Sequence, residues 1–470
     1  MIEKKADLNA VESKFNFGKI FFRLMGLAIV CIMLVSGWFL WHRIEGNPPD
    51  IATEIPSSLN PSREFVLNMS DVDSGIRRVK ITIEQNGRES ILRDDVYPLK
   101  GESDMAPVHS LSVPITVDVK KLNMMDGKAI FRIMVRDNSW RSWFNGNKAL
   151  IEKDIVIDTR PPEIVVFSRD HNLNQGGAGL VIYRLTESCS ISGVMVGDIF
   201  YPGQAGYFSD PGIHLAFIAL TPFQGPGTEC FVKAVDQAGN ASRTGLPHHI
   251  KRKVFKKDAI PLSDAFLNQK MPEFDVPVSP DSRNPMLDRF IKVNKELRES
   301  NYQKISSAAT SSDTRMYWEG TFTRLPNSAP RAGFADHRTY MYQGKEIDQQ
   351  DHLGVDLASL QQSPVPAANT GRVVFTDFIG IYGNTVLLDH GFGLFSMYSH
   401  LSRFNVSAGQ TVSKNDILGY TGSTGMAAGD HLHFAMLVRN TFINPIEWWD
   451  AGWIKNNIID KIKDAQAAIK

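Results

Sequence analysis

An uncharged apolar run near the N-terminus is the feature that most restricts how this chain can fold. Residues Leu24–Trp41 read LMGLAIVCIMLVSGWFLW, eighteen positions without a charge, close to the length that spans a bilayer as a helix. A cleaved signal peptide is the alternative interpretation, but it would have a shorter apolar region and a small-x-small cleavage site. We therefore expect an uncleaved transmembrane anchor at residues 24–41.

The basic residues around this run predict its orientation. Only Arg43 follows it closely, and the next basic residue is Arg63. The preceding segment carries five basic residues, which are Lys4, Lys5, Lys14, Lys19 and Arg23. Because positively charged flanks stay in the cytoplasm, residues 1–23 are expected to form a cytoplasmic tail. The chain is then a single-pass protein of the cytoplasmic membrane, with everything after the anchor on the outer, periplasmic face.

Alternating patterns after the anchor predict β-structure. A linker rich in Pro and Ser covers residues 42–62 and leads into segments such as Arg77–Gly87 and Lys128–Ser139. These segments alternate apolar and polar residues, which is typical of half-buried strands, and the spacing of turn residues indicates β-sandwiches.

A weak internal repeat suggests two such sandwiches in tandem. IMVRDNSWRS (Ile133–Ser142) and VKAVDQAGNAS (Val232–Ser242) share the pattern of a strand that ends in Asp and a polar turn. SDVDSGIRRVKITI (Ser70–Ile83) resembles the opening strand of such a module. This arrangement resembles tandem bacterial immunoglobulin-like modules, which we place at residues 63–160 and 161–255. The resemblance implies spacers, or surfaces for a cell-wall or division partner protein. The spacer interpretation is favoured because no polar cluster here looks catalytic.

The cysteines leave the redox state of the second module open. Cys31 lies in the apolar run, so Cys189 and Cys230 are the only pair that could bridge. They fall in separate strand-like segments, and an oxidising compartment would permit a disulfide between them. Two buried free thiols fit the sequence equally well.

Two helices are expected in the remainder of the chain. A linker covers residues 256–330, and within it Met286–Ile305 has apolar residues at helical spacing, which indicates an amphipathic helix. Whether this linker blocks a nearby groove is left open by the sequence. Residues 453–470 are expected to form a short amphipathic helix packed against the preceding domain.

Two histidines one residue apart, His431 and His433, point to chemistry near the C-terminus. They lie in GDHLHFAML, an apolar stretch that follows a glycine-rich loop and has the pattern of a strand. Residues i and i+2 of a strand point to one face about 6.6 Å apart, so both imidazoles would face a cleft while Leu432 and Phe434 face the core. One imidazole could then bind a metal while the other reaches a water on it.

A second motif supplies further metal ligands. The stretch DHLGVDLAS contains His-x-Gly-x-Asp at His352, Gly354 and Asp356. Both His and Asp are zinc ligands, and the glycine lets the chain bend so that they converge. Together with His433 they form a set of three ligands, which leaves the fourth tetrahedral position open, as in catalytic zinc sites. A cysteine-rich structural zinc site is excluded because no cysteine follows Cys230.

The order of these motifs identifies a family. From residue 331 to residue 452 the chain resembles lysostaphin-type (LytM-like) zinc metallopeptidases, which cut peptide bridges of the bacterial cell wall. The resemblance rests on HLGVDLAS, PVPAANTGRVV, GNTVLLDHGFGLFSMYSHLS, VSAGQTVSKNDILGYTGSTG and HLHF, in that order. It implies one zinc ion per chain, held by His352, Asp356 and His433. It also implies that His400 and His431 are catalytic.

Several other residues near these motifs receive weaker assignments. Asn384, Ser423 in the glycine-rich loop and Asp430 are candidates to line the substrate groove, although turn formation is the simpler role for the first two. Asp430 could also orient a histidine from behind. His390, at a hairpin turn, is expected to be structural, and His337 receives no role.

The sequence as a whole predicts a mainly β protein and a wall hydrolase. We expect a transmembrane helix, two immunoglobulin-like sandwiches, a helical linker and a C-terminal antiparallel β-sheet domain. The predicted activity is hydrolysis of peptide cross-links in peptidoglycan by a zinc-activated water, since His-Glu-x-x-His is absent and His400 or His431 must accept the proton. Which of the two does so is undecided. A formal net charge of zero without a basic block gives no reason to expect a nucleic-acid partner.

Two alternatives remain open for the function. The same fold could bind and activate a separate wall amidase without being an enzyme, although such relatives typically lack metal or catalytic residues. The zinc site could also cut secreted proteins. Stem-peptide cross-links and glycine bridges are both substrates of the family that the motifs resemble.

Overall fold

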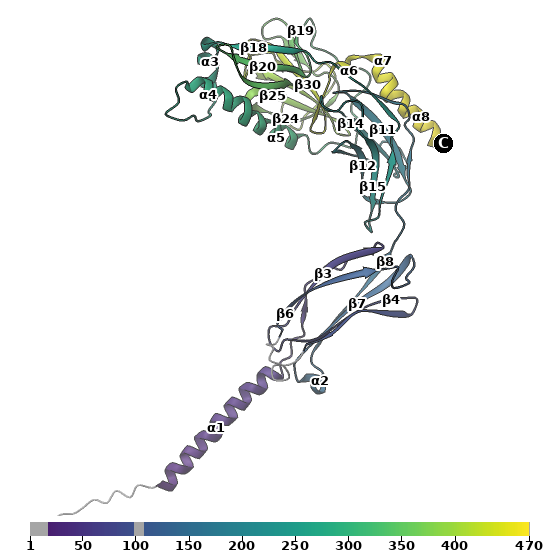
Figure 1. Ribbon diagram of the computed structural model, residues 1–470, viewed down its shortest axis with the longest axis vertical. Helices are drawn as coiled ribbons and strands as arrows, with labels where there is room; N and C mark the ends of the chain where they lie inside the picture. Colours follow the sequence, from purple (N-terminus) through teal and green to yellow (C-terminus); the bar gives the residue numbers. More distant parts are fainter. Residues whose placement is uncertain (1–16, 98–107, 470) are drawn as a thin grey trace, which may run out of the picture. The chain divides into compact units, whose positions relative to one another are not determined.

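The computed structural model describes residues 17–97 and 108–469, and the chain divides into two compact units, Met1–Arg160 and Pro161–Lys470. Helix α1 (Phe17–Arg43) includes the predicted anchor (Figure 1). Within it, Phe21–Trp41 is long and apolar enough to cross a membrane, and none of it is buried against the rest of the protein. Residues 1–16 of the predicted cytoplasmic tail lie outside the described part of the chain.

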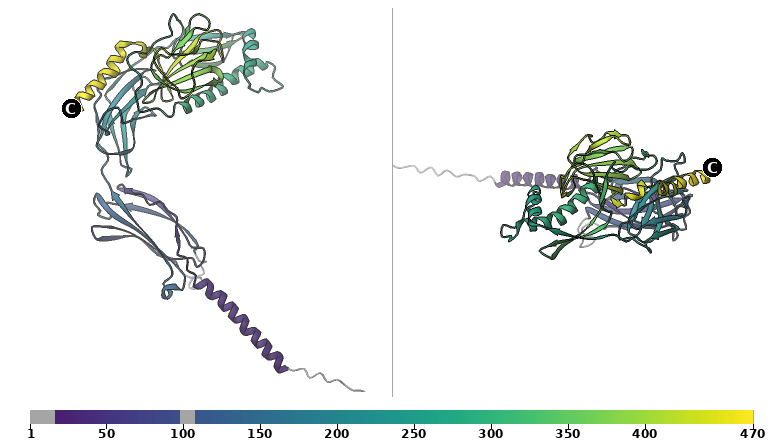
Figure 2. Two further views of the ribbon diagram at one scale, coloured as in Figure 1. Left: turned by 180° about the vertical axis from the view of Figure 1, so that it is seen from behind. Right: turned by 90° about the horizontal axis from the view of Figure 1, so that it is seen from above.

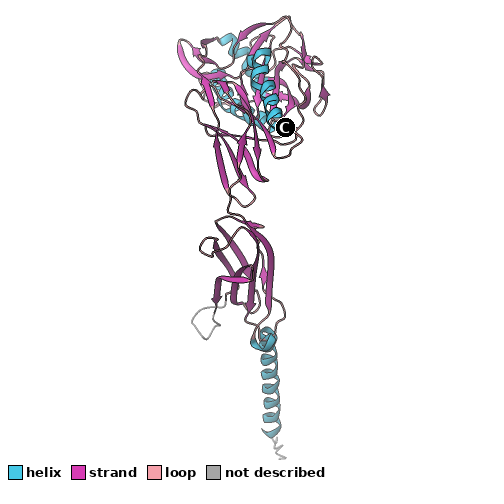
Figure 3. Ribbon diagram, turned by 90° about the vertical axis from the view of Figure 1, so that its right-hand side faces the viewer, coloured by secondary structure: helices cyan, strands magenta, loops and turns pink. Residues whose placement is uncertain are grey.

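The first unit contains a two-layer β-sandwich (Figure 3). Its core is formed by alternate residues of facing strands, such as Phe131, Ile133 and Val135, which are all fully buried. One sheet has the order β1 (Asp50–Ile51), β3 (Ser62–Ser70), β6 (Ser110–Asp118), and the other has the order β2 (Ser58–Leu59), β8 (Lys148–Ile157), β7 (Gly127–Asp137), β4 (Ile76–Gln85), β5 (Arg88–Val96). A short turn, α2 (Arg141–Phe144), joins β7 to β8. The mainly β prediction is confirmed here, whereas the immunoglobulin-like topology stays a prediction.

The second unit begins with another pair of sheets. One sheet has the order β14 (Ile213–Ala219), β11 (Ala178–Leu185), β9 (Ile164–Val166). The other has the order β13 (Ile199–Pro202), β12 (Cys189–Val196), β15 (Cys230–Asp236), β16 (Ala241–Gly245). In addition, β10 (His171–Asn174) pairs with β17 (His248–Lys251). Cys189 and Cys230 are free thiols, because they lie at opposite ends of the β12–β15 ladder, where Cys189 faces Asp236 and Cys230 faces Val196. The geometry decides against the disulfide.

A helical segment follows and lies beside the C-terminal sheet (Figure 1). We use this name for β18 (Lys257–Leu262), α3 (Asp264–Lys270), η1 (Met271–Glu273), α4 (Pro285–Lys292), η2 (Val293–Leu297) and α5 (Arg298–Ala308). The last three form one continuous helix over the predicted amphipathic stretch, with a π-helical turn at η2. Strand β18 pairs in parallel with β20 (Asp336–Tyr342), which ties the segment to the C-terminal domain.

The C-terminal domain is built on an eight-stranded antiparallel sheet. Its order is β19 (Ala329–Ala332), β22 (Val355–Ala358), β30 (Leu432–Val438), β26 (Leu394–Leu401), β25 (Gly383–Gly391), β24 (Gly371–Ile379), β28 (Thr411–Val412), with β31 (Thr441–Ile443) on β30. The central strands β26 and β30 are buried along their whole length. Smaller pairings involve β21 (Lys345–His352) with β20, and β23 (Pro364–Pro366), β29 (Ile417–Tyr420) and β27 (Arg403–Phe404). A 3-10 turn, η3 (Gly380–Tyr382), joins β24 to β25.

The C-terminal helices join the two halves of the second unit. They are α6 (Ile446–Trp449), α7 (Ala451–Ile454), η4 (Lys455–Ile459) and α8 (Asp460–Ile469). Helix α8 was expected to pack on the C-terminal domain, and it lies along the sheet that contains β11, where Lys461 Nζ donates to the carbonyl of Arg169 (Figure 2). One continuous hydrophobic core runs from Leu173 to Ala465, so residues 161–255 share their core with the C-terminal domain.

Candidate metal centre and active site

Two adjacent strands place two of the predicted ligands face to face. In the antiparallel pair β22–β30, Asp356 lies directly opposite His433. The flanking Leu432 and Phe434 are 2% exposed and belong to the core, so the alternation of the strand turns His433 to the other face. His431 precedes β30 and forms an isolated bridge with Gly422.

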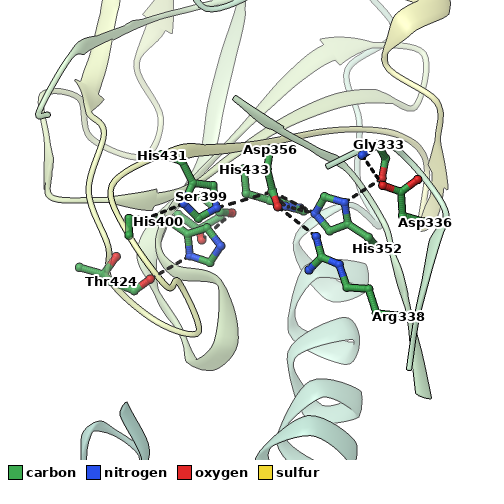
Figure 4. A network of polar contacts seen from close by, with 12 residues as sticks. Gly333, Asp336, Arg338, His352, Asp356, Ser399, His400, Thr424, His431 and His433 are labelled. Carbon is green, nitrogen blue, oxygen red and sulfur yellow. Dashed lines mark hydrogen bonds and ion pairs between the residues drawn. The ribbon is translucent and has the colours of Figure 1, made fainter. Parts of the chain in front are cut away.

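The third predicted ligand, His352, ends β21 and completes the cluster (Figure 4). Its Nε2 atom lies 3.0 Å from Asp356 Oδ1 and 3.0 Å from His433 Nδ1, and the last two atoms are 2.9 Å apart. These three atoms are a potential metal-ligand group. Three atoms with lone pairs at such distances repel one another unless a proton or a metal cation lies between them.

Gly354 is required by close packing and not by an unusual backbone angle. A Cβ atom at this position would lie 2.5 Å from Cε1 and Nε2 of His433. The glycine was predicted to let the chain bend, but it is needed instead for the space that the His433 ring occupies.

Hydrogen bonds behind the ligands fix which nitrogen faces the centre. The Nδ1–H of His352 donates to the carbonyl of Gly333 at 2.8 Å, which leaves Nε2 as a lone-pair donor. Burial lowers the pKa of His433 to about 4, so the ring is neutral near pH 7 and can act as a ligand. Although burial opposes ionisation of Asp356, the surrounding histidines hold the pKa of its carboxyl well below the usual range. Two imidazole nitrogens and one carboxylate oxygen are a donor set that fits zinc.

An arginine that the sequence motifs did not reveal contacts this centre. Nη2 of Arg338, on β20, donates to Asp356 Oδ2 at 3.1 Å, and it thereby directs the other oxygen, Oδ1, toward the two histidines. Arg338 belongs to the strand Asp336–Tyr342, whose sequence carries no metal-site pattern, so only the pairing of strands could bring it here.

The two predicted catalytic histidines lie beside the ligands. His400, the next-to-last residue of β26, has a backbone φ of +61°, a left-handed conformation that is uncommon for a residue with a side chain. Its Nδ1–H donates to the carbonyl of Thr424 at 2.8 Å, and its ring centroid lies 4.8 Å from that of His431. His431 donates from Nδ1 to the carbonyl of Gly429 at 2.8 Å, and its Nε2 lies 3.6 Å from Asp356 Oδ1.

These contacts give the two histidines different electrostatic environments. Burial, followed by the nearby histidines His431 and His433, lowers the pKa of His400 well below its usual range. Burial also lowers the pKa of His431, but the contact with Asp356 outweighs it and the net shift is upward.

All five side chains line one cleft of about 440 Å³. The helical segment supplies part of its wall, including Leu262, Phe290 and Arg298, and η3 supplies Tyr382, whose ring centroid lies 5.5 Å from that of His433. The predicted antiparallel sheet with a groove is therefore confirmed, and part of the groove wall comes from outside the predicted domain.

The three weaker groove candidates do not line this cleft. Asn384 donates from Nδ2 to the carbonyl of Leu401, next to His400, and Ser423 accepts at its carbonyl from Lys270 Nζ. Asp430 accepts from the backbone N–H of Gln362, and no hydrogen bond within residues 17–97 and 108–469 joins it to a site histidine. Their roles toward substrate stay predictions.

The two unassigned histidines lie outside the cluster. His390 is fully buried, donates to the carbonyl of Thr370 and contacts Ser396, and burial lowers its pKa to about 4. His337 pairs with Asp351. These contacts are structural.

Comparison with known proteins agrees with the motifs. The sequence model of Peptidase family M23 matches residues 350–445. DD-carboxypeptidase/endopeptidase Mpg of Neisseria meningitidis is 37% identical over 95 residues, 20% of this chain and 22% of that relative. Peptidoglycan DD-endopeptidase ShyA of Vibrio cholerae is 36% identical over 96 residues, again 20% of this chain and 22% of the relative. The chain thus spans about a fifth of the length of these relatives.

Among solved structures, the catalytic domain of the antimicrobial peptidase lysostaphin from Staphylococcus simulans is similar to this chain. The two are 30% identical with a TM-score of 0.24, and the similarity covers 27% of this chain and 96% of that domain. The matched motifs and the family model agree, and the C-terminal part of this chain is a Peptidase family M23 domain of the LytM-like type.

Proposed function

We propose that this protein is a membrane-anchored zinc endopeptidase that hydrolyses peptide cross-links of peptidoglycan. The observation that carries the proposal is the convergence of His352 Nε2, Asp356 Oδ1 and His433 Nδ1 within 3.0 Å of one another, beside His400 and His431. A zinc ion bound by these three atoms would supply Lewis acidity and lower the pKa of a water molecule toward neutrality.

The remaining work of the reaction falls to the two other histidines. Each one donates its Nδ1–H to a backbone carbonyl, so in the neutral ring Nε2 carries the lone pair toward the cleft. A proton on His431 Nε2 is stabilised by Asp356 Oδ1 at 3.6 Å, whereas no carboxylate lies as close to His400 among the described residues. We therefore assign proton acceptance to His400, and stabilisation of the negative charge on the substrate carbonyl oxygen to His431.

The alternative of a non-enzymatic amidase activator is less well supported. Such a protein needs only a binding surface, and nothing would keep five chemically competent side chains together around one point. Here all five line one cleft. Cleavage of secreted proteins would use the same chemistry and differs only in substrate.

The names of the relatives bear on the substrate. Both relatives described above are DD-peptidases, and this favours a stem-peptide cross-link over a glycine bridge for this chain. The apolar segment Phe21–Trp41 supports a single membrane span. The basic residues that precede it favour an N-terminus inside and a catalytic domain in the periplasm. The β-sandwiches would then hold the domain away from the membrane, or contact a partner in the cell wall.

Purified full-length protein in detergent tests this proposal. With zinc, the wild-type chain should release peptides from purified sacculi and bind one zinc ion, and His433→Ala should abolish both. His249→Ala is the matched control, because His249 is an exposed histidine on β17 outside the site. Retained hydrolysis in His433→Ala, or inactivity of the zinc-loaded wild type on every defined cross-linked peptide, would refute the endopeptidase.

A further inference from the structure

Three arginines line the cleft. Arg338 pairs with Asp356, Arg331 is exposed, and Arg298 is half-buried without an acidic partner among the described residues. Arg298 begins α5 and lines the same cleft as the ligands and the two catalytic histidines. Its Nε donates to the carbonyl of Asn294 at 3.2 Å, and its Nη2 donates to Asn294 Oδ1 at 2.6 Å. Tyr302 is a further hydrogen-bonding neighbour, and none of these groups is a carboxylate.

The acidic residues of the cleft are already paired with other cations. Asp356 accepts from Arg338, and Asp258 forms an ion pair with Lys256 at 2.7 Å. No aspartate or glutamate of residues 17–97 and 108–469 lies in ion-pair range of Arg298. A guanidinium in a partly apolar cleft without a counter-charge is costly to desolvate, and an anion that enters the cleft offsets this cost.

The position of Arg298 is set by rigid structure. The π-helical turn η2 precedes it, and both acceptors of its hydrogen bonds belong to Asn294 in that turn. Asn294 is fully buried and donates to Asp348 Oδ2 at 2.6 Å. One turn after Arg298, fully buried Asn301 accepts from the backbone N–H of Ile381, which fixes α5 against η3. The guanidinium is thus held in place before any ligand arrives.

Arg298 is close to the reaction site but does not belong to the metal centre. Tyr382 lines the same cleft as Arg298, and its ring centroid lies 5.5 Å from that of His433. Because Arg298 and the metal ligands share one cleft of about 440 Å³, a group bound at Arg298 lies within about one or two residues of an extended peptide from the ligands.

From these observations we infer that Arg298 binds a free carboxylate of the substrate peptide, one or two residues from the scissile bond. A planar guanidinium and a carboxylate form two parallel hydrogen bonds, so the pair fixes orientation as well as charge. Arg298 is then a residue that determines specificity, and peptides whose carboxylate is amidated are poor ligands. This inference rests on the proposed function only for the class of substrate, because it concerns binding.

Binding of wall peptides to full-length protein in detergent tests the inference without turnover. Three forms of one stem peptide are compared: with both carboxylates free, with the C-terminal carboxylate amidated, and with the side-chain carboxylate amidated. Calorimetry is performed on metal-free and on zinc-loaded protein, because persistence of the preference without metal shows that the carboxylate is not merely a zinc ligand. Amidation of the recognised carboxylate should weaken binding by about ten- to a hundredfold, which identifies that carboxylate.

Variants connect this preference to one side chain. Arg298→Gln should bind all three peptides as weakly as the wild type binds the amidated one, and Arg298→Lys should retain part of the preference. Lys304→Gln is the matched control, since it removes the same charge from the same continuous helix at an exposed side chain outside the cleft. Equal binding of all peptides by the wild type, or an intact preference in Arg298→Gln, would overturn the inference.

The two proposals fail in different ways. A zinc-loaded wild type that binds peptides with the preference but never cleaves them would refute the endopeptidase and leave the carboxylate site standing. Cleavage at the same rate with and without amidation would refute the carboxylate site and leave the endopeptidase standing. Should Arg298→Gln fail to fold, the wild-type peptide comparison together with Arg298→Lys decides the matter.

Discussion

Asp356 and His433 are direct cross-strand neighbours on β22 and β30, with Oδ1 and Nδ1 2.9 Å apart. Backbone hydrogen bonds of a central sheet therefore set the spacing of these two predicted ligands, and His352 reaches them from the end of β21, a strand of a separate three-stranded sheet. A site on strands is more rigid than one on loops, which suits a centre that must hold three donors in a fixed geometry.

The space beside the His433 ring leads to a first prediction. Gly354→Ala places a methyl group 2.5 Å from that ring, so the ring must move away from Asp356. We expect zinc affinity to fall roughly ten- to a hundredfold, measured by competition with a chelating dye. Gly245→Ala, where a Cβ would meet nothing within 4 Å, should bind zinc normally. Unchanged affinity in Gly354→Ala would show that the ring adapts.

The ion pair between Arg338 and Asp356 leads to a second prediction. Arg338→Gln removes the cation that holds Oδ2, so Oδ1 is no longer directed at the histidines, and zinc affinity should fall about tenfold. Arg338→Lys should recover part of the loss. The same titration on Arg243→Gln, whose side chain is 73% exposed, controls for loss of a surface charge. Equal zinc affinities in all four proteins would argue that Arg338 is irrelevant to the centre.

Separation of zinc binding from catalysis is a third prediction. His400→Ala removes the proposed proton acceptor but no metal ligand, so cleavage of a defined cross-linked peptide should fall by about a hundred- to ten-thousandfold. Zinc content, measured by atomic absorption, should stay at one ion per chain. Loss of zinc together with activity would instead place His400 in the metal shell.

The buried carboxyl of Glu447 gives a fourth prediction, for stability against pH. Glu447 is 8% exposed, accepts from Asn174 Nδ2 at 2.6 Å and from the Ala178 N–H at 2.9 Å, and burial raises its pKa to about 7. Its neutral form is favoured in the folded chain. The contribution of Glu447 to the free energy of unfolding is therefore fully present below pH 4.5 and is lost as the pH rises through about 7. The loss at alkaline pH is about 3 kcal/mol in total.

Glu447→Gln tests this pH dependence, because an amide does not ionise. Denaturant titrations of the transition of residues 161–470 give the free energy of unfolding of the wild type and of the variant. The variant should become more stable relative to the wild type as the pH rises from 5 to 8. At pH 5 the variant should be slightly less stable, since one oxygen cannot satisfy both donors. Parallel curves for the two proteins would mean that Glu447 is not protonated in the native state.

The thiols provide a fifth prediction. Cys189 and Cys230 lie at opposite ends of paired strands, and burial raises the pKa of each thiol to about 11. The protein purified without reductant should therefore carry three free thiols, of which those of Cys189 and Cys230 alkylate slowly until the protein is unfolded. Mass spectrometry after denaturing alkylation counts them. A species two alkyl groups short would reveal a disulfide and a different strand register.

Local patterns were sufficient for much of this protein. His-x-Gly-x-Asp and His-x-His predict three metal ligands and one catalytic histidine, and the structure brings all four of these side chains to one cleft. The uncharged run identifies the helix that could span a membrane, and the period of two identifies the mainly β fold, which is confirmed. The assignment to the LytM-like family is also confirmed. The site roles and the domain boundaries stay predictions.

Contacts between segments distant in the chain required the tertiary structure. Arg338 reaches Asp356 from β20, Arg298 enters the cleft from a helix that sequence assigned to a linker, and Glu447 of α6 holds Asn174 of β10. Neither the free thiols nor the single core of residues 173–465 could be read from spacing. The physical reason is the range of the interactions. Periodicity records which face of its own element a side chain occupies, whereas strand order and helix packing decide which other element that face meets.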